Sequence, residues 1–243
     1  MNLQIRIEVI ARRFLLSGTI CIAALAGCAH SEHATGYEKA EPSGFLKDYS
    51  MLHAAANETD ATLVYFMPDK ARFKSYKKVW VEPVQVWRGE KSSAKDLDKE
   101  DATYLSQFLW SRLDEEFRKD YMMVQEPGPG VMRLRVGITE AGKSIPVLDN
   151  LTAPVSMVLY DGKKSLGGIQ PFVGKATIEA EVTDSQTGEL LAAAVDRRGG
   201  SKYAWKSLHR WGDVESAYTY WAKKFAWRAC MMRVDFTCEP PEE

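Results

Sequence analysis

Two stretches of the chain repeat apolar residues at the spacing of an amphipathic helix. In residues 97–119 the repeat begins at Ala102 and continues through Leu105, Leu109, Leu113 and Phe117, so these residues share one face of a helix. Three acidic residues open this segment, where negative charge favours the helix N-terminus. A second stripe, in residues 213–233, consists of Val214, Ala217, Tyr218, Trp221, Phe225 and Met232. The pattern predicts a helix in each segment.

Other segments alternate apolar and polar residues or are rich in β-branched and aromatic residues, which is typical of strands. We predict strands at residues 63–67, 78–87, 121–125, 131–138, 176–183 and 189–197. The turn sequence Asp-Ser-Gln-Thr-Gly joins the last two into a hairpin. Pro83 cannot donate a ladder hydrogen bond, which places its strand at an edge or at a bulge. Residues 145–160, interrupted by Pro146 and Pro154, fit either a partner-facing loop or a short helix.

The order of strand, helix, strands, hairpin and helix indicates an α+β fold. We expect a single, mostly antiparallel sheet with two helices packed on one face. Residues 45–243 are enough for one domain with its own core. Glu179 and Glu181 share one side of the strand at 176–183 and alternate with apolar positions. We therefore expect both carboxylates on the solvent face of the sheet and do not interpret them as an acid–base pair.

The N-terminus has the pattern of an export signal. The apolar run at residues 14–26 follows Arg12 and Arg13, and it is shorter than the roughly 20 residues that a membrane-spanning helix needs. A signal peptide at residues 1–27 is the better interpretation. Residues 25–28, Leu-Ala-Gly-Cys, resemble the lipobox of a bacterial lipoprotein, in which Cys28 receives the lipid. Small and polar residues at 28–44 then predict a flexible tether before the folded domain.

The charge balance of the chain excludes one class of partner, and its cysteines indicate a lipid anchor and a possible disulfide. The chain has 32 basic and 33 acidic side chains, so it lacks the positive field that gathers nucleic acid. Membrane attachment would come from acyl chains on Cys28, each buried methylene contributing about 0.8 kcal/mol. Cys21 leaves with the signal peptide. Cys230 and Cys238 remain, and they form either a disulfide in an oxidising compartment or two buried thiols.

The sequence displays no catalytic set. No Gly-x-Ser-x-Gly motif is present, and such a motif would place a nucleophilic serine on a sharp turn. His30 and His33 lie in the predicted tether without cysteine or carboxylate partners at fixed spacing, so we predict no metal site. His53 and His209 have no identifiable orienting partner. We therefore predict no catalytic residue and no cofactor.

Aromatic residues are dense near the C-terminus and supply the candidate binding residues. Most of them belong to the predicted core. Tyr220 and Trp227, however, share a flank of the second helix outside its apolar stripe, and Trp110 lies across the first helix from Leu105 and Leu109. Aromatic side chains bury a large area at low entropic cost, so exposed ones anchor partners or stack on sugars. Packing within the fold is the competing interpretation.

Four segments together resemble the bacterial lipoprotein family known as domain of unknown function 3313. They are residues 44–52, 81–84, 127–135 and 184–199. The resemblance implies a lipid-anchored envelope protein and provides no catalytic residue to transfer. Lipoproteins kept at the inner membrane resemble a pattern with aspartate after the lipidated cysteine. Here that position is Ala29, which implies sorting to the outer membrane.

These observations lead to two functional hypotheses. The first is a non-enzymatic lipoprotein of the outer membrane whose domain faces the periplasm and binds an envelope protein. The alternative is a periplasmic enzyme or glycan-binding protein that acts on cell-wall material. A deep cleft that holds His53 or His209 beside a carboxylate would favour the alternative.

Overall fold

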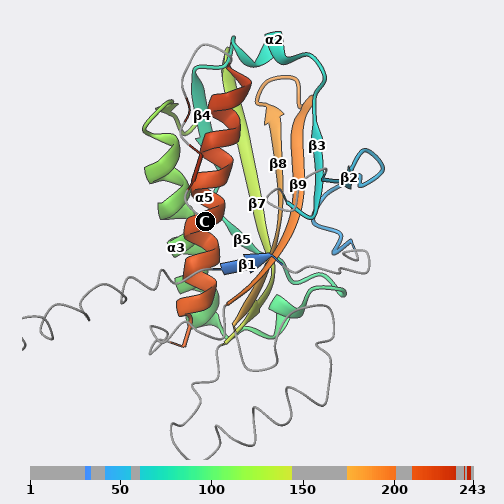
Figure 1. The fold of residues 1–243 in the computed structure, drawn as a ribbon, viewed down its shortest axis with the longest axis vertical. Helices are drawn as coiled ribbons and strands as arrows, with labels where there is room; N and C mark the ends of the chain where they lie inside the picture. Colours follow the sequence, from blue (N-terminus) through green and yellow to red (C-terminus); the bar gives the residue numbers. More distant parts are fainter. Residues whose placement is uncertain are drawn as a thin grey trace, which may run out of the picture.

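The computed structural model describes residues 31–33, 42–55, 61–143, 174–200, 210–233, 238 and 240–241. Within these ranges a nine-stranded sheet is accompanied by helices (Figure 1). The elements in chain order are β1 Ser31–His33, β2 His53–Ala54, β3 Leu63–Phe66, α2 Lys70–Phe73, β4 Lys78–Val81, β5 Gln85–Val86, the 3-10 helix η1 Ser93–Asp96, α3 Lys99–Phe117, β6 Met122–Met123, β7 Val131–Gly142, β8 Lys175–Asp184, β9 Leu190–Gly200 and α5 Gly212–Met232.

The sheet has the strand order β2-β3-β9-β8-β7-β4-β6, with β1 paired to β9 and β5 paired to β7. The long strands β7, β8 and β9 form an antiparallel meander. Strands β4 and β5 instead pair in parallel with β7, because the chain passes through α3 before it returns to the sheet. The prediction of an α+β fold with one mostly antiparallel sheet is confirmed.

Helices α3 and α5 lie beside one another along the sheet (Figure 1). The main core cluster contains Leu109 of α3, Trp221 of α5, and Ile138 and Ile178 of the sheet, all of them at most 1% exposed. Asp98 caps α3, because its carboxylate accepts the backbone N–H of residue 101 at 2.7 Å. None of the helices described is both long and apolar enough to span a membrane.

Two predicted strands are shorter than the sequence pattern indicated. The strand expected at residues 78–87 is divided into β4 and β5, with Pro83 in the gap between them, since proline lacks the N–H that a continuous ladder needs. The strand expected at 121–125 is reduced to the two residues of β6, which pair with β4. The hairpin of β8 and β9 forms as predicted.

A second, smaller core cluster fixes the segment that follows the predicted tether. Phe45 and Leu46 pack there with Ala193 and Val195 of β9. The ring of Phe45 lies against Gly137, where an added Cβ would be 2.5 Å from the ring atom Cδ2. This close approach requires glycine at that position.

The same segment buries the carboxylate of Glu179, which the alternation of apolar and polar residues assigns to the solvent face of the sheet. Glu179 is only 1% exposed. It accepts hydrogen bonds from the backbone N–H groups of Ser43 at 3.0 Å and Leu46 at 3.4 Å. The solvent-face prediction is therefore wrong for Glu179, because residues 43–46 cover that part of the sheet. Glu181, two residues further along, is half-buried and pairs with Arg135.

Parts of the segment at residues 28–44, for which a flexible tether is predicted, have contacts with the sheet. Residues Ser31–His33 form β1, which pairs antiparallel with the end of β9. Ser43 is buried, and its carbonyl accepts the indole N–H of Trp87 at 3.0 Å. The polar composition hid these contacts because a strand at a sheet edge is held by backbone hydrogen bonds, which composition does not reveal. The loop or short helix considered at residues 145–160 lies outside the described residues.

Candidate functional site

Trp110 is the predicted binding residue that the structure leaves most accessible. It is 39% exposed, and its indole N–H donates to the carbonyl of Val81 in β4 at 3.3 Å. The side chain lines a groove of about 730 Å³ between α3 and the sheet edge. Other lining residues are Trp80, Pro83, Gln107, Asp114, Arg118 and Met123. The hydrogen bond to β4 fixes an exposed aromatic ring at the groove wall.

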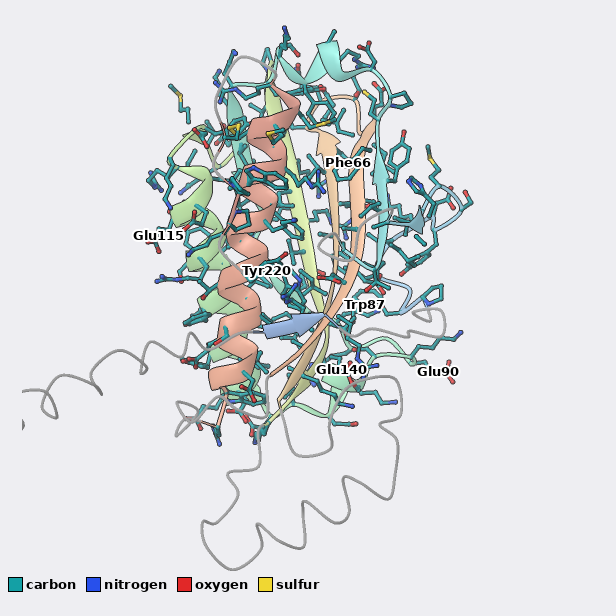
Figure 2. The ribbon with its side chains drawn as sticks, viewed as in Figure 1. Phe66, Trp87, Glu90, Glu115, Glu140 and Tyr220 are labelled. Carbon is teal, nitrogen blue, oxygen red and sulfur yellow. A yellow bond between two sulfur atoms is a disulfide. The ribbon has the colours of Figure 1, made fainter. Side chains whose placement is uncertain are left out.

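Tyr220 does not belong to an exposed surface, and its assignment as a partner-binding residue is wrong. It is 7% exposed, and the guanidinium carbon of Arg198 lies 3.7 Å from its ring centre. Figure 2 labels Tyr220 on α5. The helical stripe alone could not indicate this, because Tyr220 is covered in part by the buried Arg198 of β9.

Trp227 is half-buried and lies between two cationic side chains of its own helix. Lys224 Nζ is 4.6 Å from a ring centre of the indole and Arg228 Cζ is 4.7 Å from one. Its indole N–H has no hydrogen-bond partner within the described part of the chain. The structure therefore gives Trp227 a packing contact with Lys224 and Arg228.

Of the two states considered for the remaining cysteines, the structure has the disulfide. Cys230 near the end of α5 is bonded to Cys238, and their Cα atoms are 6.1 Å apart. The bridge ties the segment after α5 to the helix end. Cys28 lies outside the described residues, so its acylation stays a prediction.

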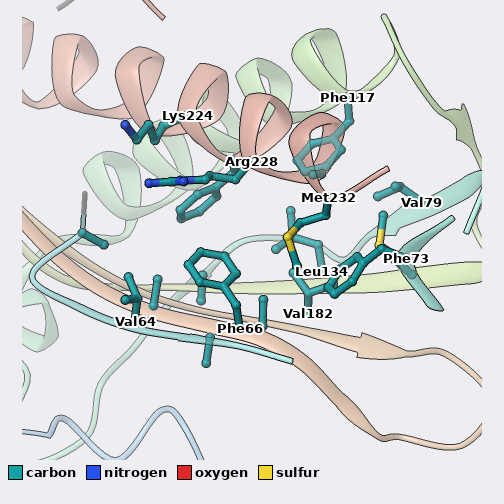
Figure 3. A pocket seen from close by; sticks show the side chains of 18 residues that line it. Val64, Phe66, Phe73, Val79, Phe117, Leu134, Val182, Lys224, Arg228 and Met232 are labelled. Carbon is teal, nitrogen blue, oxygen red and sulfur yellow. The ribbon is translucent and has the colours of Figure 1, made fainter. Parts of the chain in front are cut away.

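An apolar crevice between the C-terminal half of α5 and strands β3, β8 and β9 is the site that the sequence analysis missed (Figure 3). Its volume is about 80 Å³. The sheet side is built largely from small residues, including Ala180 and residues 192–194, all alanine. Val64 and Phe66 of β3 continue that side, and Phe225 and Met232 of α5 lie opposite. A crevice of this composition excludes polar groups.

Two cationic side chains lie at the opening of the crevice. Lys224 and Arg228, one helical turn apart, both extend from α5 above Val64 and Phe66 (Figure 3). The guanidinium carbon of Arg228 is 5.8 Å from the ring centre of Phe66. Burial beside these apolar groups lowers the pKa of Arg228, although an arginine side chain stays charged at neutral pH. In the sequence, the run of three alanines at 192–194 is the feature that could have indicated this crevice, because their small side chains leave space beside the sheet.

The histidines do not assemble a catalytic centre among the residues described. His53 lies in the two-residue strand β2, is exposed, and lines neither the groove nor the crevice. His30 and His209 are outside the described ranges. Within those ranges no group of three or more histidine, cysteine, aspartate or glutamate side chains is placed to hold a metal ion.

The model of a protein family described as "Protein of unknown function (DUF3313)" matches residues 41–225. The chain belongs to this family. The membership indicated by the four sequence motifs is confirmed. No curated protein matches the chain.

The residues of the DUF3313 motifs have structural contacts in this chain. Asp184 closes the β8–β9 turn by accepting the backbone N–H groups of Gln186 at 2.9 Å and Thr187 at 2.8 Å. It also accepts the hydroxyl of Tyr76 at 2.9 Å. These three bonds lower the pKa of Asp184 against the opposing effect of burial. In this chain the motif residue Asp184 therefore stabilises the β8–β9 turn and connects it to Tyr76.

Three solved structures are similar to parts of the chain. A dodecamer of PelC from Paraburkholderia phytofirmans is 13% identical, covering 61% of this chain and 84% of PelC, with a TM-score of 0.36. Protein XCC0632 from Xanthomonas campestris is 11% identical and covers 67% and 89% of the two chains, with a TM-score of 0.40. Lipoprotein GNA1162 from Neisseria meningitidis is 17% identical and covers 58% and 93%, with a TM-score of 0.32. At these scores the similarities carry no conclusion about the function of this chain.

Proposed function

We propose that this DUF3313 protein is a lipid-anchored lipoprotein of the bacterial outer membrane. In this proposal the signal peptide at residues 1–27 is removed, Cys28 carries acyl chains, and the domain at 45–243 faces the periplasm. The support is the lipobox-like sequence at residues 25–28 and the presence of Ala29 after the cysteine. The protein acts by binding an envelope protein and has no catalytic role.

The pairing of β1 determines how far the domain would extend from such an anchor. Ser31, the first residue of β1, is three residues after Cys28. Three extended residues span at most about 11 Å. The end of the sheet where β1 meets β9 would therefore lie next to the lipid headgroups. This arrangement supports a domain held close to the membrane, in place of the long flexible tether expected from composition.

The exposed ring of Trp110 in the groove carries the binding part of the proposal. A monomeric domain usually covers such a large aromatic side chain, and aromatic anchors in concave surfaces contribute most to protein association. The hydrogen bond from its indole to Val81 holds the ring in place, so little side-chain entropy is lost when a partner binds. Residues of α3 and β4 line the groove together with Met123 of β6, the edge strand of the sheet.

Site-specific photocrosslinking in intact cells tests this proposal. A photoreactive amino acid replaces Gln107, which lines the groove, or Glu115, which is exposed elsewhere on α3. We expect one discrete adduct with an envelope protein from position 107, none from position 115, and loss of the adduct with Trp110→Ala. Equal adducts from both positions, or an adduct that survives Trp110→Ala in folded protein, would refute the groove as the binding site.

A second candidate function, glycan binding, is favoured by one feature of the same groove. Trp80 and Trp110 both line it together with the polar side chains of Gln107 and Asp114. Aromatic platforms beside such polar groups suit sugar rings. Saturable quenching of tryptophan fluorescence by soluble peptidoglycan fragments, lost with Trp110→Ala, would support this candidate. Unchanged fluorescence would leave the protein partner as the proposed ligand.

A further inference from the structure

The groove around Trp110 begins where the pairing of β6 with β4 ends. The N–H of Val124, just after β6, donates to the carbonyl of Val79 at 3.0 Å. Two residues further along β4, the carbonyl of Val81 faces the same edge, because the backbone groups of a strand alternate between its two edges. This carbonyl accepts the indole N–H of Trp110 at 3.3 Å. Trp110 therefore occupies the position at which the ladder of hydrogen bonds would otherwise continue.

The edge of β4 at the groove is unsuited to a partner that adds as a β-strand. An added strand needs backbone donors and acceptors along the edge that it joins. Here the carbonyl of Val81 is used by Trp110, and Pro83, which also lines the groove, has no N–H. A segment that binds in the groove must therefore be held by contacts with side chains.

The side chains that line the groove favour a segment of low charge. Trp80 and Trp110 supply two aromatic rings. The charged lining residues are Asp114 and Arg118, and they pair with each other at 2.8 Å, one turn apart on α3. Charge complementarity therefore selects neither a basic nor an acidic partner for this groove.

Two side-chain amides supply hydrogen-bond donors. Gln107 of α3 and Gln125 after β6 are exposed and line the groove, and each amide group carries two N–H donors. The prolines of a proline-rich segment have carbonyl acceptors and no N–H, so such a segment complements these donors and does not need the edge of β4. Its polyproline II conformation is formed before binding, which lowers the entropic cost.

The dimensions of the groove fit a short segment of this kind. The wall formed by α3 extends from Ser106 to Arg118, which is about 18 Å along the helix axis. A polyproline II segment advances about 3.1 Å per residue, so about six residues cover this length. The groove volume of about 730 Å³ lies within the roughly 300–1,000 Å³ that is typical of ligand pockets.

We propose that the groove binds a proline-rich segment of its protein partner in the polyproline II conformation. Proline rings pack against Trp80 and Trp110, and carbonyls of the segment accept hydrogen bonds from Gln107 and Gln125. The inference rests on the proposed function, because it specifies the chemistry of the partner that the groove binds. A β-strand and a glycan are the competing occupants, and the test separates them.

The test measures peptide binding to the full chain purified from membranes in detergent. The probe is a fluorescein-labelled peptide of ten prolines, and fluorescence anisotropy reports its binding. An alternating threonine–valine peptide of the same length, which favours the strand conformation, is the control peptide. We expect saturable binding of the proline peptide and none of the control peptide. Absence of binding by the proline peptide would overturn the proposal, and so would binding of the threonine–valine peptide or of soluble peptidoglycan fragments in its place.

Variants of the lining residues place the bound peptide in the groove. Trp110→Ala should weaken binding of the proline peptide about tenfold or more, as expected for an aromatic anchor. Tyr104→Ala is the matched control, because Tyr104 is also 39% exposed on α3 and does not line the groove. Gln125→Ala should weaken binding about threefold through a lost hydrogen bond, and it decides if Trp110→Ala does not fold. Unchanged affinity in the folded variants of Trp110 and Gln125 would overturn the proposal.

Photocrosslinking from position 107 in cells distinguishes this inference from the proposed function. An adduct with an envelope protein, together with no binding of the proline peptide, would reject the proline-rich segment and keep the protein partner. Binding of the proline peptide that depends on Trp110, without any adduct in cells, would support the chemistry of the groove and refute the envelope partner.

Discussion

The hydroxyl of Tyr49 donates a 2.5 Å hydrogen bond to the buried carboxylate of Glu179. The two residues are 130 positions apart in the chain. Through this bond and the two backbone N–H donors, the segment after β1 is fixed to strand β8. The N-terminal motif at residues 44–52, which helped to identify the family, is thus an element that closes one face of the sheet.

Neutralising Glu179 should weaken this attachment. Glu179→Gln replaces one carboxylate oxygen, which accepts hydrogen bonds, by an NH2 group, which donates them. That NH2 group would face the backbone N–H groups and the Tyr49 hydroxyl, which are also donors. We expect the free energy of unfolding to fall by about 2 kcal/mol, the typical contribution of hydrogen bonds to a charged group. Urea denaturation followed by fluorescence measures the change. Glu90→Gln, at an exposed position labelled in Figure 2, should have no effect. Equal stability of both variants would contradict the role assigned to Glu179.

Gly137 should not tolerate a side chain while Phe45 is present. An added Cβ would lie 2.5 Å from the Phe45 ring, so we expect Gly137→Ala to cost about 1–3 kcal/mol through overpacking. Gly128→Ala is the matched control, because its nearest neighbour would be at 3.8 Å. In a Phe45→Ala background the penalty of Gly137→Ala should disappear. If Gly137→Ala still lowers the free energy of unfolding in the Phe45→Ala background, the clash is not with the Phe45 ring and the explanation is wrong.

Stability should decline at alkaline pH. Burial and the bond to Glu179 raise the pKa of Tyr49 from 10.0 to about 12, and burial and the bond to Asp184 raise that of Tyr76 to about 12. The unfolded chain loses these protons first, so the stabilisation is complete below pH 10 and is lost as pH rises from 10 to about 12. Unfolding free energies measured across this window should fall less steeply in Tyr49→Phe. An unchanged slope would argue against the raised pKa.

The disulfide should contribute to stability through the loop that it closes. Cys230 and Cys238 are eight residues apart, and a loop of this size contributes about 2–3 kcal/mol by restricting the unfolded chain. We expect the double variant Cys230→Ser, Cys238→Ser to lose that amount in urea denaturation. Alkylation and mass analysis of the native protein should find neither thiol free. Two alkylated thiols in protein isolated without reductant would contradict the bridge.

Local patterns predicted the elements that depend on local sequence. The stripe through Leu105 and Leu109 gave α3, and the turn before Glu189 gave the β8–β9 hairpin. Alternation also assigned Glu179 to the face opposite Ile178, which is the arrangement in the structure. It could not show that this face is covered, because the cover comes from Phe45 and Leu46 far away in the chain.

The candidate binding sites depend on tertiary contacts more than the helices and the hairpin do. The exposure of Trp110 followed from its position across α3 from the buried stripe. The burial of Tyr220 could not be predicted, because it needs the side chain of Arg198 from another strand. The crevice likewise needs α5 to cross above three alanines of β9, and only the placement of the helix on the sheet reveals it.

The anchor is the central claim, and the mass of the N-terminal peptide tests it most directly. The protein is extracted from cell membranes with detergent, digested and analysed by mass spectrometry. We predict a terminus at Cys28 that carries a diacylglycerol thioether, and its absence from Cys28→Ala. A terminus at Cys28 without lipid, or a chain that retains residues 1–27, would contradict the account.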